Sequence, residues 1–199
     1  MGRPVRDRHT RIEGSLMKFT ETPLKGAYLI DADPVLDERG LFARTYCEKE
    51  FNALGLHTRF PQMNTSYNGK KGTLRGMHYQ AAPYEEVKVV RCTAGEIYDV
   101  IIDIRKESAT CLKWFGVVLS AENRRAIYIP KGFAHGFLTL KDSTELLYMM
   151  GENYHPEAAR GIRWNDPAIG IRLPDGVRFI SEKDSSYADY VRASGKKEL

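Results

Sequence analysis

Two short segments of the sequence hold most of the residues that could perform acid–base chemistry. The segments are GTLRGMHYQ at 72–80 and PKGFAHGF at 130–137. They contribute His78 and His135, and histidine titrates near neutral pH and can remove or return a proton. Arg75 could hold phosphate oxygens with its planar guanidinium, and Lys88 could place a point charge beside a forming oxyanion. These residue types predict proton transfer on an anionic substrate.

The same two segments resemble the paired sequence motifs of cupin barrels. The matching residues are Gly72, His78 and Gly95 for the opening motif and Pro130, Gly132 and His135 for the closing motif. A metal-binding cupin has a second histidine where this chain has Gln80, and a neutral amide is a weak metal ligand. The sequence therefore predicts no metal ion and no other cofactor. The nearby carboxylates of Glu85 and Glu86 keep a metal-dependent dioxygenase open as an alternative.

The elements that must position His78, His135 and Lys88 are short apolar runs rich in Val, Ile, Tyr and Phe. Turn-forming residues separate one run from the next. Their starts lie about a dozen residues apart, a spacing typical of an antiparallel sandwich or barrel. Residues 47–56 predict a helix, because Phe51 and Leu54 share a face and Gly55 supplies a stop. We predict an all-β jelly-roll (cupin) barrel with a few short helices, whose edges the turn-rich sequence after Pro156 wraps. The expected strands are 27–37, 73–80, 87–92, 96–104, 113–120, 125–130, 136–140 and 144–150.

The chain of 199 residues has room for one domain. We expect a single domain over 17–190, a disordered or added extension over 1–16, and a frayed tail over 191–199. The net charge is +4, part of it in the extension, so the body lacks the basic stripe of a nucleic-acid binder. Three scattered cysteines and the lack of a membrane-spanning apolar run predict a cytoplasmic protein that binds no membrane.

Several stretches, in order along the chain, resemble the dTDP-4-dehydrorhamnose 3,5-epimerase family of nucleotide-sugar enzymes. They are DERG at 37–40, KKGTLRGMHYQ at 70–80, KVVRCTAGEIYDVIIDIRKES at 88–108, LSAENRRAIYIPKGFAHGFLTL at 119–140, ELLYMM at 145–150, GIRWNDPAIGIRLP at 161–174 and SEKD at 181–184. The resemblance implies a jelly-roll homodimer that epimerises a 4-keto-6-deoxy sugar on a nucleoside diphosphate without a metal. It also implies a place in carbohydrate biosynthesis, such as that of lipopolysaccharide.

The resemblance further implies catalytic roles. His78 would remove the proton alpha to the C4 ketone, Asp184 would accept a hydrogen bond from its imidazole, and Tyr148 would return a proton from the opposite face. A ketone's alpha proton is too weakly acidic for histidine unless the enolate is stabilised. Lys88, with His135 beside it, is therefore expected to face the carbonyl oxygen. Asp184 would fix the tautomer of His78 and favour the imidazolium after transfer.

Other residues match positions that the family uses to bind its substrate. They are Arg39 and Arg75 for the phosphates or neighbouring groups, Gln62 and Asn64 in a Q-x-N turn, and Lys183 and Tyr154, the last near an aromatic expected to stack on the base. Alternative interpretations remain for three residues. Arg39 could be a solvated charge in its glycine-containing turn, Asp184 could cap a helix, and Tyr154 could pack in the core.

The chain departs from the family pattern at two arginines. Arg44 and Arg160 stand where the dTDP-rhamnose enzymes commonly carry acids, so we expect a changed charge at the nucleoside end and weaker selectivity for thymidine. The nucleotide, the sugar and the number of inverted centres stay open. The alternatives are an epimerase of another nucleotide 4-keto sugar (single-centre, or CDP- or GDP-linked), a 3,4-ketoisomerase, and a non-catalytic cupin that binds a sugar nucleotide.

Overall fold

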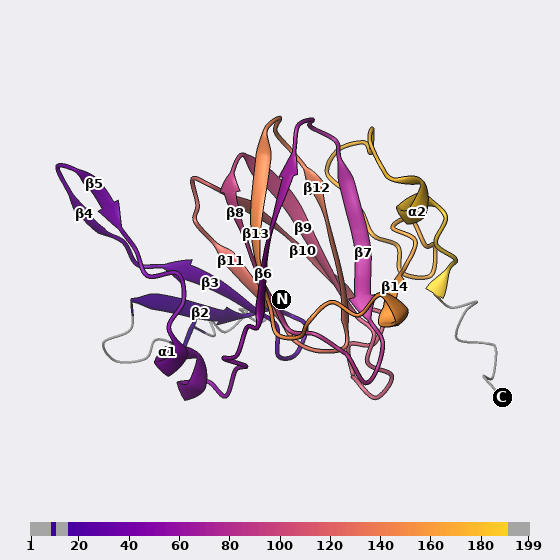
Figure 1. The fold of residues 1–199 in the computed structure, drawn as a ribbon, viewed down its shortest axis with the longest axis horizontal. Helices are drawn as coiled ribbons and strands as arrows, with labels where there is room; N and C mark the ends of the chain where they lie inside the picture. Colours follow the sequence, from indigo (N-terminus) through magenta and orange to yellow (C-terminus); the bar gives the residue numbers. More distant parts are fainter. Residues whose placement is uncertain (1–8, 11–15, 191–199) are drawn as a thin grey trace, which may run out of the picture.

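Two antiparallel β-sheets packed face to face make up most of the computed structural model, which describes residues 9–10 and 16–190 (Figure 1). The strands of the larger sheet are β1 (His9–Thr10), β2 (Met17–Glu21), β3 (Tyr28–Ala32), β6 (Gln62–Asn68), β8 (Lys88–Ala94), β11 (Ala126–Ile129) and β13 (Thr144–Met150). Those of the smaller sheet are β7 (Leu74–Gln80), β9 (Glu96–Asp103), β10 (Trp114–Ser120), β12 (Phe133–Thr139) and β14 (Ala159–Gly161). Their orders are β1-β2-β3-β11-β8-β13-β6 and β10-β9-β12-β7-β14. The predicted jelly-roll (cupin) barrel is confirmed.

The inner core lies between the two sheets. It is built from the inward side chains of both, including Val90 and Cys92 on β8, Ile101 on β9 and Phe137 on β12. Val89, the neighbour of Val90 on β8, points to the other side and belongs to a separate cluster on the outer face of the larger sheet. This alternation is the period-two pattern of a strand buried on both faces.

The outer face of the larger sheet is covered by the predicted helix, α1 (Glu48–Ala53). Phe51 is fully buried there, and its ring meets that of Phe19 edge to face with centroids 5.5 Å apart. Leu54 packs against the same cluster. Gly55 follows with a φ of +67°, a conformation that favours glycine and ends the helix as predicted.

The segment after Pro156 covers an outer face of the barrel as well as the predicted sheet edge. It begins with a turn of 3-10 helix (Pro156–Ala158) and β14, which pairs with β7. Ile162 and Ile169 then pack on the outer face of the smaller sheet, against Val100 and Ile102 of β9. The segment closes with α2 (Glu182–Ser185), beside β7 on the right of Figure 1.

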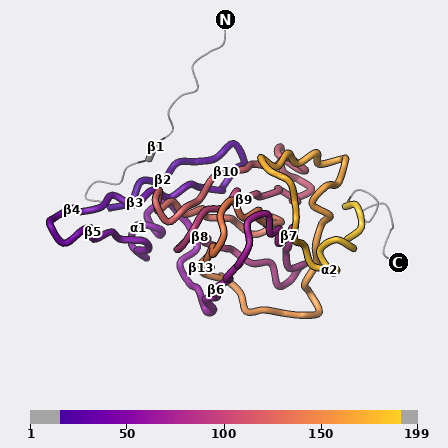
Figure 2. The backbone as a smooth tube through the Cα atoms, turned by 90° about the horizontal axis from the view of Figure 1, so that it is seen from above, coloured from indigo at the N-terminus to yellow at the C-terminus, as the bar shows by residue number. Residues whose placement is uncertain are grey.

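One expected strand, 27–37, is two strands in different parts of the structure. β3 ends at Ala32, before Pro34, a residue that cannot donate to a strand ladder. The chain then leaves the sheet and forms a hairpin of β4 (Val35–Asp37) and β5 (Gly40–Phe42). Figures 1 and 2 both show this hairpin extending away from the barrel, at the end opposite α2.

The Q-x-N segment is also a strand and not a turn. β6 starts at Gln62 and pairs along its whole length with β13, as an edge strand of the larger sheet. Its sequence, QMNTSYN, lacks the apolar alternation that would have indicated a strand, because most of its side chains are exposed or half-exposed. The backbone ladder, and not side-chain burial, holds this segment.

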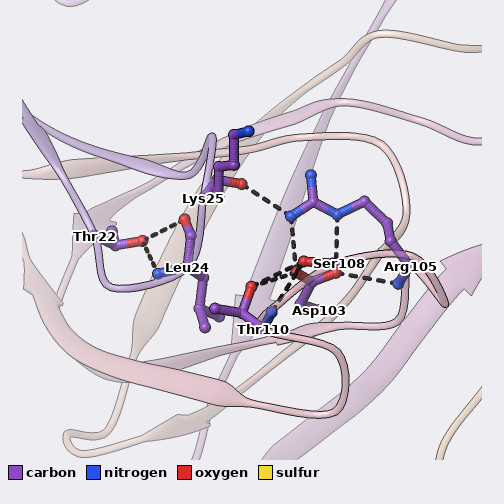
Figure 3. A network of polar contacts seen from close by, with 7 residues as sticks. All are labelled: Thr22, Leu24, Lys25, Asp103, Arg105, Ser108 and Thr110. Carbon is purple, nitrogen blue, oxygen red and sulfur yellow. Dashed lines mark hydrogen bonds and ion pairs between the residues drawn. The ribbon is translucent and has the colours of Figure 1, made fainter.

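A buried carboxylate anchors the loop that follows β9 (Figure 3). Asp103 is fully buried and accepts hydrogen bonds from the side chains of Arg105, Ser108 and Thr110 and from the Arg105 amide. Arg105 also donates to the Lys25 carbonyl. Burial alone would raise the pKa of Asp103, but these hydrogen bonds outweigh it and lower the pKa to about 2.

The two expected end segments lie mostly outside the described residues, which omit 1–8, 11–15 and 191–199. Within the expected extension over 1–16, His9–Thr10 form β1 and pair with Phe19 and Thr20 of β2. All three cysteines are free, and no helix in the described part of the chain is both long and apolar enough to cross a membrane.

Candidate active site

A pocket of about 280 Å³ lies between the two sheets. Strands β6, β7, β8, β12 and β13 supply its walls, so both sheets contribute. The lining residues are Asn64, Thr65, Ser66, Arg75, His78, Lys88, His135, Gly136, Phe137, Tyr148 and Met150. Three of the four predicted catalytic residues, His78, Lys88 and Tyr148, line the pocket. The fourth, Asp184, lies outside the lining and contacts His78.

His78 and Asp184 form a close pair at the edge of this pocket. The His78 Nε2 atom lies 2.7 Å from Asp184 Oδ1, and the Gly76 amide donates to the other carboxylate oxygen at 3.1 Å. Ser181 caps α2 by accepting from the Asp184 amide, which fixes the turn that carries the carboxylate. Burial would raise the pKa of Asp184, but the hydrogen bonds from His78 and Gly76 outweigh it and lower the pKa.

A close approach of two strands places His78 beside His135. The two histidines are directly opposite in the β7–β12 register. A Cβ on Gly76 would lie 2.5 Å from the Gly136 Cα, and a Cβ on Gly136 would lie 2.6 Å from the Arg75 carbonyl oxygen. Only glycine fits at both positions, so Gly76 and Gly136 let the two histidine-bearing strands approach each other closely.

A second histidine–carboxylate pair lies deeper, and sequence reasoning missed its acid. His135 Nε2 is 2.7 Å from Asp99 Oδ2, and both side chains are buried. The Oδ1 atom of Asp99 is buried without a hydrogen-bond partner in the described structure. Asp99 interrupts the apolar run of β9, and a lone acid in such a run was the signal that could have revealed it.

Tyr148 faces this second pair from the opposite sheet. Its ring meets that of His135 edge to face with centroids 6.1 Å apart. Burial, followed by the nearby charge of Asp99, raises the pKa of Tyr148 strongly, although Arg75 and a hydrogen bond with Ser66 act in the other direction. The phenol therefore keeps its proton at neutral pH and is available as a proton donor.

Lys88 brings a buried ammonium to the pocket floor. Its Nζ lies 2.8 Å from a carboxylate oxygen of Glu86, and both side chains are 8% exposed. It also lies 3.4 Å from the His78 carbonyl oxygen. Glu86, one of the two carboxylates considered from sequence as metal ligands, is the ion-pair partner of Lys88. Among residues 9–10 and 16–190, no three His, Cys, Asp or Glu side chains are grouped as metal ligands.

Gln80 has a structural role in place of ligation. Its amide nitrogen donates to the carbonyls of Tyr84 and Asn153, and its oxygen accepts from the His155 amide. The side chain is buried and joins two loops next to the pocket. Both amide hydrogens and the amide oxygen therefore bond to backbone groups that hold these loops.

The predicted binding residues fall into two groups, of which the first lies in or next to the pocket. Arg75 lines it and donates to Asn68 at 2.7 Å, and Asn64 lines it from β6. Gln62 is one step further out, where its amide donates to Asn64 and its oxygen accepts from the Tyr154 amide. Tyr154 is 57% exposed and so does not pack in the core.

Three other predicted arginines lie outside the pocket of their own chain. Arg39 is exposed at the tip of the hairpin and pairs with Asp37. Arg44 pairs with the buried Glu50 of α1, on the outer face of the larger sheet. Arg160 is exposed on β14 and donates to backbone carbonyls of its own segment. Within one chain, Arg44 and Arg160 lie outside the pocket, and each is held by local partners. Their predicted place at the nucleoside end stays a prediction.

Lys183 lies on α2, next to Asp184, with an exposed side chain. Its charge acts on Tyr187, a residue that sequence reasoning did not single out. Tyr187 follows α2 and its ring lies edge to face with His78, centroids 6.1 Å apart. No sequence motif marked this tyrosine, because its place depends on how the segment after α2 folds back on β7.

The sequence and the fold have clear counterparts among known proteins. The model of the dTDP-4-dehydrorhamnose 3,5-epimerase family matches residues 21–191. The chain belongs to this family. The dTDP-4-dehydrorhamnose 3,5-epimerase of Methanothermobacter thermautotrophicus is 47% identical over 174 residues, which cover 85% of this chain and 92% of the relative. That of Shigella flexneri is 42% identical over 178 residues, covering 89% of this chain and 98% of the relative.

The structural similarity extends over the same region. The crystal structure of dTDP-6-deoxy-D-glucose-3,5-epimerase from Legionella pneumophila, in complex with dTDP-4-keto-L-rhamnose, matches with a TM-score of 0.81 and 39% identity. The match covers 86% of this chain and 91% of that one. As a member of the dTDP-4-dehydrorhamnose 3,5-epimerase family, the chain is a carbohydrate epimerase, which is an isomerase.

Proposed function

We propose that this epimerase acts on a 4-keto-6-deoxy sugar carried on a nucleoside diphosphate, with the dTDP-linked sugar as the first candidate. The observation that supports it most is the grouping of a base, an acid and a cation in one pocket. His78 is paired with Asp184, Tyr148 keeps its proton, and Lys88 is a buried ammonium. The relative from Legionella pneumophila, whose structure holds dTDP-4-keto-L-rhamnose, supports the choice of sugar.

Proton removal is assigned to His78. The Nε2 atom of His78 is hydrogen-bonded to Asp184, so its Nδ1 atom takes the proton from the carbon next to the C4 ketone. The electron pair of that C–H bond moves into the C–C bond, and the C4 oxygen becomes an enolate oxygen. Asp184 stabilises the imidazolium that forms, as the acid of a catalytic triad does. Its lowered pKa keeps it charged for this role.

The enolate oxygen is assigned to Lys88. An ammonium held in a buried site stabilises a forming oxyanion more strongly than it would in water. Glu86 balances the charge of Lys88 while the pocket is empty, which reduces the cost of burying the cation.

Inversion follows when Tyr148 gives its phenolic proton to the carbon from the face opposite His78. The phenolate then recovers a proton from water and the imidazolium loses its own, so the enzyme returns to its starting state. The same cycle at a second carbon flanking the ketone would invert C3 as well as C5. All these steps use side chains, so the proposal needs no metal ion or cofactor.

We assign the sugar's diphosphate to Arg75, Lys183 and an arginine from a second chain. Arg39, at the hairpin tip, does not line the pocket of its own chain. Its side chain is 85% exposed and so is accessible to a second chain. The same hairpin exposes an apolar group, Val35, Leu36, Leu41 and Phe42. A homodimer in which this hairpin lies on the partner would cover that group and bring Arg39 to the partner's site. The nucleoside is assigned to the side of Gln62 and Tyr154.

We also propose that the enzyme is cytoplasmic and serves carbohydrate biosynthesis such as that of lipopolysaccharide. The three free cysteines suit a reducing compartment.

The test is the conversion of dTDP-4-keto-6-deoxy-D-glucose in deuterated water, followed by NMR. Exchange of protons at C3 and C5 with formation of the L-rhamno product is the expected result. Exchange at one carbon only would support a single-centre epimerase. A parent enzyme that exchanges no proton of this sugar, or of its UDP-, CDP- and GDP-linked forms, would overturn the proposal.

A further inference from the structure

Tyr187 is the aromatic residue that touches the predicted base from the C-terminal segment. It lies three residues after Asp184, just beyond α2, and is half-buried. Its ring meets the His78 imidazole at an interplanar angle of 75°, with centroids 6.1 Å apart. One short segment therefore supplies both the carboxylate at the Nε2 atom of His78 and an aromatic wall beside its ring.

The backbone beside His78 fixes the place of this ring. Gly161 on β14 is the cross-strand neighbour of His78 on β7. A Cβ added to Gly161 would lie 2.1 to 2.5 Å from the Cε2, Cζ and Cδ2 atoms of Tyr187. The tyrosine ring thus packs directly on the glycine backbone, in space that any other residue would fill.

Tyr187 also lies within electrostatic range of Lys183, a predicted substrate contact. Burial, the largest effect, raises the pKa of the Tyr187 phenol, and the charge of Lys183 opposes that rise. The phenol therefore stays protonated and neutral beside the His78 ring.

His78 needs such a wall because its side chain is 43% exposed. A single hydrogen bond to Asp184 fixes one ring nitrogen but leaves the imidazole free to swing about that contact. Proton abstraction requires the base within hydrogen-bond reach of the C–H bond, and a misplacement of about 1 Å can cost about 10²-fold in rate. The side wall removes this freedom.

We propose that Tyr187 is a positioning residue. Its ring holds the His78 imidazole in the orientation for proton abstraction. This inference rests on the proposed epimerase function, in which His78 is the base.

Two substitutions at Tyr187 test the role of the ring. Tyr187→Leu removes the ring, so we expect a fall in kcat of about 10- to 100-fold for both epimerisation and deuterium exchange. Tyr187→Phe keeps the ring, so this conservative variant should restore most of the kcat that Tyr187→Leu loses. Gly161→Ala should lower kcat in the same way, because its new methyl group displaces the tyrosine ring while Tyr187 itself is retained.

The matched control is Tyr190→Leu. Tyr190 packs in the same C-terminal segment against the outer face of the smaller sheet, without contact to His78. It should lower the thermal midpoint without changing kcat or KM below that midpoint. A Tyr187→Leu enzyme with parent kcat, or a Tyr190→Leu enzyme with the same kcat loss, would overturn the inference. Failure of the parent enzyme to exchange any proton would instead overturn the proposed function.

Discussion

The buried carboxylate of Asp103 gives a stability prediction whose size follows from the structure. The ordinary pKa of 3.8 falls to about 2 in the folded chain, because five hydrogen-bond contacts outweigh the cost of burial. At ~1.4 kcal/mol per pKa unit, this shift corresponds to about 2 kcal/mol of folding free energy at neutral pH. In Asp103→Asn, the new amide nitrogen also faces hydrogen-bond donors, which adds about 1 kcal/mol or more to the loss of folding free energy.

The pH dependence has a definite sign. The folded pKa of Asp103 lies below the unfolded value, so the stabilisation is fully present above about pH 4 and is lost as the pH falls toward 2. At pH 3 the parent should have lost about 1 kcal/mol of this contribution, which Asp103→Asn never had. The difference in unfolding free energy between the two proteins is therefore about 3 kcal/mol at pH 7 and about 1 kcal/mol smaller at pH 3.

Urea unfolding of both proteins at the two pH values measures this difference. Asp175→Asn is the control, since Asp175 lies at the surface, where it pairs with Lys71 and accepts from the Gly176 amide, and its replacement should change stability little. At pH 7 the thermal midpoint of Asp103→Asn should fall by about 6–12 °C. Equal stability of variant and parent at pH 7, or a difference that does not narrow at pH 3, would refute the assignment of this stabilisation to Asp103.

Three further predictions concern the site and the assembly. Tyr148→Phe should still exchange the alpha proton through His78 but yield no inverted product, and inverted product at the parent rate would remove Tyr148 from the mechanism. Arg44→Glu should destabilise the fold, because the new acid would face the buried carboxylate of Glu50. It should leave the preference among dTDP, UDP, CDP and GDP in competitive binding unchanged, and a reordered preference would place Arg44 in a nucleotide site. Phe42→Asp should raise the dissociation constant of the proposed homodimer at least about tenfold in sedimentation equilibrium, with unchanged circular dichroism; an unchanged constant, or a parent that sediments as a monomer, would refute the proposed role of the hairpin.

Sequence patterns predicted the elements whose side chains are buried on a regular period. Residues 96–104 and 144–150 correspond closely to β9 and β13, and 47–56 contains α1. β6 escaped prediction because an edge strand with exposed side chains has no apolar alternation. The hairpin of β4 and β5 escaped for a related reason, since its apolar residues are exposed and stand apart from the core.

The candidate site was predictable where motif residues are close in sequence or match the family. His78, His135, Lys88 and Tyr148 all line the one pocket, as expected. The partners of these groups depend on three-dimensional placement instead. Asp99 reaches His135 through the pairing of β9 with β12, and Tyr187 reaches His78 through the fold of the C-terminal segment. The local partners of Arg44 and Arg160 could not be predicted, because a charge pattern does not say which nearby carboxylate or carbonyl will hold each guanidinium.

Proton exchange by His78→Asn tests the central claim most directly. The variant and the parent are incubated with dTDP-4-keto-6-deoxy-D-glucose in deuterated water, and NMR counts deuterium at each sugar carbon over time. We predict exchange by the parent and a loss of about 10²- to 10⁴-fold at every carbon in the variant, with dTDP binding and circular dichroism retained. Exchange by His78→Asn at the parent rate would show that another group is the base.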